Sequence, residues 1–183
     1  SLVMALQTIV SRNVDPLQMA VVTVGAFHAG EANNVIPPHA SLRLSVRALD
    51  RDVRALLRRR ITELAQQQAA SYDCTAEVDY RAGYSVLVNT LAETDFARRV
   101  ALELLGADRV TLQAPALPGS EDFAFMLEKV PGCYLLVGNG DGTDAAFSGH
   151  ACMVHNPGYD FNDAALPVGA AYWALLTERY LPT

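Results

Sequence analysis

His155 is the residue best placed for metal chemistry, within the segment MVHNPGYDFND. It follows an apolar, strand-like step and precedes an Asn-Pro-Gly turn, where a neutral imidazole can be held rigidly toward a cleft. A catalytic zinc needs about three protein ligands, so His155 alone does not establish a metal site. A hydrogen-bonded structural histidine is the alternative, and His155 is therefore a candidate metal ligand.

Four further residues could bind an anion. Gly119 and Ser120 begin the segment GSEDFAFMLEKVPG, where loop N–H groups and a short helix capped by Ser120 could hold a carboxylate. Arg47, on the polar face of an alternating segment, could clamp a carboxylate with two parallel hydrogen bonds. Asn34 lies in NNVIPP, whose prolines rigidify the backbone and could aim its amide at a ligand. A solvated strand arginine and a turn-forming asparagine are the alternatives.

Several other chemistries are excluded or disfavoured. Glu121 and Asp122 are adjacent at a predicted helix start, where they point different ways and favour the helix dipole rather than paired acid–base work. No P-loop, G-x-S-x-G elbow or Rossmann fingerprint is present. The run Arg58-Arg59-Arg60 has no interleaved aromatic residues and indicates the solvated face of a helix.

Composition excludes further partners. Lys plus Arg number 14 against 20 Asp plus Glu, and a net charge of −6 is the wrong sign for neutralising phosphates, so we expect no nucleic-acid partner. No apolar run approaches the roughly 20 residues that cross a bilayer, so we expect no membrane partner. The three cysteines form no C-x-x-C pair, which disfavours a disulfide framework or zinc knuckle and predicts a reducing, cytoplasmic location.

Hydrophobic periodicity predicts the elements that position these residues. Residues 1–12 have apolar residues at helical spacing, 20–24 form a β-branched run, and 40–48 alternate strictly. Asp50 or Asp52 can cap a helix that reaches about Ala70. Residues 74–80 alternate again, as a third strand. The order predicts an α+β, ferredoxin-like split βαβ unit that lacks its first strand, which we expect upstream of Ser1.

The pattern changes after Gly83. Thr90 and Glu93 form a capping-box pattern that begins a helix ending at Gly106, which predicts a domain boundary near residues 84–90. Cys133–Val137 is predicted to be a short strand. A final helix follows residues 160–163, with a proline tolerated in its first turn.

Three segments together resemble a known family: GAFHAGEANNVIPPHASLRLSVRAL, LPGSEDFAFMLEKVPGCYLLVGNG and MVHNPGYDFNDAALPVGAAYWALLTERYL. They are similar to the metal-dependent amidohydrolases that include bacterial hippurate hydrolases, N-acyl-amino-acid aminoacylases and carboxypeptidases. The resemblance spans nearly the whole chain. It implies that residues 1–84 are most of a lid, or dimerisation, domain and that residues 85–183 are the C-terminal part of an α/β di-metal hydrolase domain.

The resemblance also implies roles for individual residues. His155 matches the family's C-terminal metal ligand. Asn34 and Arg47 match lid residues that reach the substrate carboxylate, typically in the partner subunit's active site. Gly119 and Ser120 match the loop that lines the substrate pocket. His28 matches a position that the family does not keep as histidine throughout, so the resemblance gives it no role.

For the complete protein, the resemblance implies hydrolysis of the amide bond of hippurate-like N-acyl amino acids. It implies two divalent ions per active site (Zn, Mn, Co or Ni) and a homodimer formed through the lid. The remaining ligands, the general-base glutamate and the oxyanion histidine would precede Ser1, so we expect this chain alone to be inactive. A dipeptidase or desuccinylase is one alternative, and a non-catalytic dimerisation or carboxylate-binding module is another.

Overall fold

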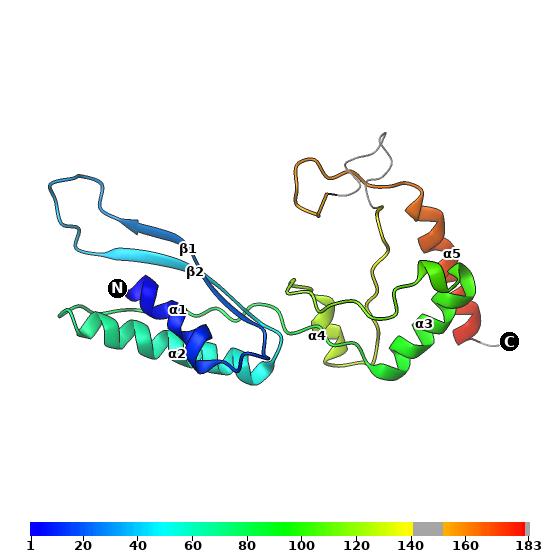
Figure 1. Cartoon of the computed structure of the whole chain (residues 1–183), viewed down its shortest axis with the longest axis horizontal. Helices are drawn as coiled ribbons and strands as arrows, with labels where there is room; N and C mark the ends of the chain where they lie inside the picture. Colours follow the sequence, from blue (N-terminus) through cyan, green and yellow to red (C-terminus); the bar gives the residue numbers. More distant parts are fainter. Residues whose placement is uncertain (141–151, 182–183) are drawn as a thin grey trace. The chain divides into compact units, whose positions relative to one another are not determined.

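The structure is a computed structural model that describes residues 1–140 and 152–181 (Figure 1). The chain divides into two compact units, residues 1–87 with 117–124 and residues 88–116 with 125–183. The helices and strands are α1 Leu2–Asn13, β1 Ala20–Ala29, β2 Ala40–Ala48, α2 Arg51–Ala70, α3 Leu91–Leu105, a 3₁₀ turn Ala107–Arg109, α4 Phe123–Leu127 and α5 Ala165–Tyr180. None of the described helices combines the length and apolarity that a membrane crossing requires.

In the first unit, two helices pack on one face of an antiparallel hairpin. α1 lies against β1 and α2 against β2, and the two helices contact each other (Figure 1). Leu6, Ile9 and Leu57 fill the space between them and are at most 2% exposed. The Asp50 carboxylate caps α2 by accepting the backbone N–H groups of Asp52 and Val53, each at 2.9 Å. These residues fix both helices over the hairpin.

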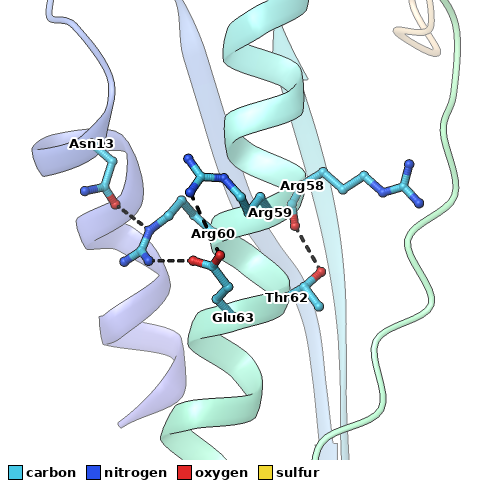
Figure 2. Close-up of polar contacts among 6 residues, drawn as sticks. All are labelled: Asn13, Arg58, Arg59, Arg60, Thr62 and Glu63. Carbon is cyan, nitrogen blue, oxygen red and sulfur yellow. Dashed lines mark hydrogen bonds and ion pairs between the residues drawn. The ribbon is translucent and has the colours of Figure 1, made fainter.

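The last arginine of the predicted solvated run connects the two helices. Arg60 donates through Nε to the Asn13 side chain at 3.2 Å and through Nη1 to the Glu63 carboxylate at 2.8 Å (Figure 2). Arg59 contacts the same carboxylate at 3.9 Å, and its side chain is 63% exposed. The prediction of a solvated face therefore describes Arg59 better than Arg60, which joins α2 to the end of α1.

The third predicted strand, residues 74–80, does not form. The described residues contain a single sheet of two strands, and 74–80 is extended without ladder pairing. Tyr80 still packs against the core, with the Arg58 guanidinium 5.6 Å from its ring centroid. In a split βαβ unit, another strand separates the two parallel strands and pairs with both. No described segment occupies that place, so the alternation persists without a hydrogen-bond partner.

β1 is longer than the strand that the β-branched run 20–24 predicts. The register shifts between Val24 and Ala26, so Gly25 is an extra residue opposite β2, and pairing continues to Ala29. Such a bulge lets a strand continue past an irregularity while it changes which side chains share a face. Paired strand therefore extends past the predicted run 20–24, through residues 26–29.

In the second unit, α3 begins at the expected place with different hydrogen bonds. The Thr90 hydroxyl contacts the Glu93 carboxylate, which lowers the pKa of Glu93, and accepts the Gly132 N–H at 2.9 Å. Gly106 ends the helix with a positive φ of 77°. The Thr90 hydroxyl therefore connects the start of α3 to Gly132 and makes no capping bond to the helix's own N–H groups.

The predicted strand Cys133–Val137 is wrong. The Asn89 side chain takes the place of a neighbouring strand: its Nδ2 donates to the Tyr134 carbonyl and its Oδ1 accepts the Tyr134 N–H, each at 2.9 Å. One side-chain amide satisfies both backbone groups of a single residue, so no ladder extends beyond it.

α5 packs on α3 through polar contacts. The Tyr172 hydroxyl donates to the Ala97 carbonyl at 3.1 Å, and Arg179 forms a two-point ion pair with Glu103. Pro167 falls in the first turn of α5, as predicted. The observed mixed α/β architecture agrees with the predicted class, while the split βαβ arrangement stays a prediction.

Candidate functional site

Arg47 contacts the loop that was predicted to line the substrate pocket. Its Nη1 donates to the Pro118 carbonyl at 2.8 Å, across 71 residues of sequence. Residues 117–124 belong to the same compact unit as β2. The structure therefore brings three of the predicted substrate-binding residues, Arg47, Gly119 and Ser120, into one neighbourhood. A guanidinium has five N–H donors, so one bond to Pro118 leaves donors for a ligand.

Ser120 does not cap a helix. α4 begins at Phe123 and has five residues, and the Phe123 N–H donates to the Glu121 carboxylate at 3.3 Å. The prediction of a helix start at Ser120 is wrong because the Glu121 side chain satisfies the first turn in its place. Any anion binding at Gly119–Ser120 must therefore come from loop N–H groups and not from a helix dipole.

Asn34 lies far along the hairpin from Arg47. It belongs to the exposed connection between β1 and β2, which Figure 1 shows at one end of the hairpin, whereas Arg47 is the second-last residue of β2. Ala40 and Arg47 are seven steps apart along the strand, about 23 Å at the usual rise per residue. Arg47 and the connection that carries Asn34 therefore lie toward opposite ends of β2.

His155 is an exposed residue in a strained turn of the second unit. The Asn156 N–H donates to the Met153 carbonyl at 3.1 Å, and His155 has a φ of 70°. This is the third position of a type II turn, which normally takes glycine or asparagine. Left-handed backbone at a histidine is uncommon and is enriched at functional sites.

A second turn follows immediately and fixes the segment. The Tyr159 N–H donates to the Asn156 carbonyl at 2.9 Å, and the Asn156 side chain accepts the Gly158 N–H at 2.8 Å. Asn139 connects the segment to the preceding chain: its Nδ2 donates to the Asp160 carbonyl at 2.8 Å. Hydrogen bonds on both sides therefore hold the backbone that carries His155.

The described residues fit one ligand of a metal site and not a whole site. Across 1–140 and 152–181, no three His, Cys, Asp or Glu side chains gather closely enough to hold an ion. His155 is exposed and carried on a fixed turn, which suits an imidazole that completes a cage formed with other groups.

Sequence reasoning missed the residues that fix these positions. Pro118, Asn139 and the Asn156 side chain make the hydrogen bonds that hold Arg47 and the His155 turns. Only Asn156 had a local signal, because Asn-Pro-Gly is a typical turn sequence.

Comparison with known proteins identifies the class. The model of peptidase family M20/M25/M40 matches residues 5–179. The hippurate hydrolase of Campylobacter jejuni is 38% identical over 180 residues, covering 98% of this chain and 45% of that protein. The N-acetyl-L-cysteine deacetylase of Bacillus subtilis is 34% identical, covering 98% of this chain and 40% of that protein.

Solved structures agree. A putative aminohydrolase from methicillin-resistant Staphylococcus aureus has a TM-score of 0.78 at 26% identity, covering 98% of this chain and 45% of that one. A dinuclear metal-binding M20 peptidase from Bacillus subtilis has a TM-score of 0.75 at 29% identity, covering 100% and 46%. The chain belongs to peptidase family M20/M25/M40, which confirms the resemblance found in the sequence. It spans less than half the length of these relatives.

Proposed function

We propose that this chain is part of a metal-dependent amidohydrolase that cleaves the amide bond of N-acyl amino acids. The observation that carries the proposal is the bond between Arg47 and Pro118, which holds a cationic side chain beside the Gly119–Ser120 loop. A guanidinium and free loop N–H groups together suit a substrate carboxylate. The names of the hippurate hydrolase and deacetylase relatives support an N-acyl amino acid as the substrate class.

In this proposal, His155 is one metal ligand of a site with two divalent ions, Zn, Mn, Co or Ni. The ions would lower the pKa of a bound water and polarise the amide carbonyl. This chain's own contribution is positional: the two turns fix the backbone that carries the imidazole, and Arg47 with Gly119 and Ser120 orients the substrate. One ligand cannot hold two ions, so this chain alone should be inactive.

The test compares this chain with a longer polypeptide that joins it to an upstream half of the family's type. Hippurate hydrolysis and bound metal are measured in both. We expect metal and activity in the longer protein only, lost in His155→Ala and kept in the exposed control His39→Ala. A well-folded longer protein without metal and activity would refute the hydrolase. An inactive longer protein that still bound acyl amino acids as a dimer would favour a non-catalytic binding module. Activity on dipeptides or succinyl derivatives alone would favour a dipeptidase or a desuccinylase.

The separation of Asn34 from Arg47 supports a composite site. Asn34 follows the start of the hairpin connection and Arg47 lies near the other end of β2, about 23 Å along the strand. We propose that Asn34 therefore serves the substrate bound by the partner copy, in a homodimer formed through the first unit. Mixing the inactive variants Asn34→Ala and Arg47→Ala of the longer protein should restore activity, since one site of each mixed dimer then has both residues. Mixed dimers without any recovered activity would contradict the composite site.

A further inference from the structure

The bulge at Gly25 changes the face on which His28 lies. Before the bulge, Val22 pairs with Val46 and Val24 with Leu44, all on the face covered by α1 and α2. Without an extra residue, His28 would share this face because it has the same parity. The shifted register instead pairs His28 with Ser41. Ser41 alternates with Leu42, which packs on the core, so His28 lies on the face away from the helices.

That open face is cationic. Along β2 it carries Ser41, Arg43, Ser45 and Arg47, and their partners on β1 are His28, Ala26, Thr23 and Val21. None of these eight residues is acidic, although the whole chain has a net charge of −6. Arg43 and His28 are diagonal neighbours, since their respective partners are Ala26 and Ser41, and such pairs are within reach of long side chains.

Among the described residues, neither the Arg43 nor the His28 side chain has a polar partner. The Arg43 guanidinium and the His28 imidazole make no hydrogen bond or ion pair with any residue in the part of the chain that the structure describes. Glu31, the nearest acid to His28 in sequence, lies in the connection beyond β1 and pairs with neither of them. By contrast, five arginines elsewhere in the described residues form ion pairs: Arg59, Arg60, Arg81, Arg98 and Arg179.

We propose that Arg43 and His28 form a second carboxylate-binding site, on the same face as Arg47, which recognises the side chain of an acidic amino acid. The inference rests on the proposed function, in which Arg47 takes the α-carboxylate. Arg43 and Arg47 are four residues apart, about 13 Å along the strand, a gap that two arginine side chains shorten from both ends. The substrate class is then an N-acyl amino acid with a second carboxylate.

Two probes of this chain test the site: N-acetyl-L-glutamate and its neutral analogue N-acetyl-L-glutamine. Binding is followed by NMR shifts of the His28 ring and the arginine side chains. We expect the dicarboxylate to bind about fivefold more tightly, a preference typical of an exposed charge pair. Arg43→Gln and His28→Gln should each reduce that preference, and Arg12→Gln, an exposed arginine on α1, should leave it unchanged.

The outcomes separate this site from the proposed function. Arg47→Gln should weaken the binding of both probes equally. If Arg47→Gln leaves their binding unchanged, that result counts against the proposed α-carboxylate clamp alone. Equal or undetectable binding of the two probes, or equal loss of preference in Arg43→Gln and Arg12→Gln, would overturn the second site. All substituted side chains are exposed, so circular dichroism should show unchanged folding.

Discussion

The two compact units bury their apolar side chains to different extents. In the first unit, α1 and α2 contribute Leu6, Ile9 and Leu57, which are at most 2% exposed. Among the described residues of the second unit, only Ala97 and Val100 are buried hydrophobics, and α5 has no buried residue. The first unit therefore has an aliphatic core of its own, and the second has a much smaller one.

Directional polar contacts take a larger part in the second unit. Asn89 holds Tyr134, Thr90 holds Gly132, and Asn139 holds the segment before α5. Such bonds fix local geometry but contribute less to stability than burial of several large side chains. The comparison predicts that core substitutions in the first unit act globally, whereas substitutions in the second unit act locally.

The largest expected effect is that of Leu57→Ala. Truncating this fully buried side chain leaves a cavity between α1, α2 and the hairpin and should cost about 3 kcal/mol. The matched substitution Trp173→Ala removes more atoms from α5 but should cost less than about 1 kcal/mol, because that side chain is 65% exposed. Urea denaturation followed by circular dichroism measures both, and similar losses would show that the second unit depends on apolar packing too.

A smaller and more local effect is expected at Asn89. Asn89→Ala removes two hydrogen bonds to Tyr134 and should lower the free energy of local opening there by about 2 kcal/mol. Hydrogen exchange of the Tyr134 amide measures it. Asn89→Asp keeps the acceptor for that amide and should retain most of the protection. Unchanged exchange in Asn89→Ala would mean that Tyr134 is held by other contacts.

Sequence predicted the features that depend on nearby residues. The Asp50 cap, the end of α2 at Ala70, the strand 40–48 and the helix end at Gly106 all follow from local periodicity or capping. Gly25 inside a strand pattern is only a weak signal for a bulge, and the shifted register itself depends on the partner strand. The bond between Arg47 and Pro118 spans 71 residues, and no local pattern encodes it.

Candidate site residues show the same division. The identities of His155 and Arg47 came from motifs, but the left-handed turn at His155 and the loop contact of Arg47 came only from the structure. The helix start expected at Ser120 failed because a neighbouring carboxylate competes for the same N–H groups. Local sequence thus indicates which residues could act, while tertiary contacts determine where they lie.

The turn at His155 offers a test of conformational strain. His155→Gly should stabilise the turn by up to about 1 kcal/mol, because glycine adopts a φ of 70° without a Cβ clash. The Asn156 amide, which donates to Met153, should then exchange more slowly. His155→Ala keeps the Cβ and should give no such gain, so equal exchange in both variants would argue against strain.

The smallest effect concerns the ion pair between α3 and α5. The Arg179 guanidinium lowers the pKa of Glu103 below its ordinary value of 4.5. A lowered carboxyl pKa means that the stabilisation is fully present above pH 4.5 and is lost as pH falls through the lower, folded-state value. Near pH 6, the Leu181 amide at the end of α5 should therefore exchange more slowly in the wild type than in Glu103→Gln. This difference should shrink in acid.

Salt should reduce the same difference, because both side chains are about half exposed and their attraction is screened. Asp108→Asn removes a carboxylate of the same unit that makes no ion pair with Arg179, and it should leave the exchange of Leu181 unchanged. A difference between wild type and Glu103→Gln that persists in acid and at high salt would show that Glu103 contributes through packing. Since α5 buries no side chain completely, such a result would mean that partly exposed apolar contacts hold it to α3, and the contrast between the two units would be one of degree.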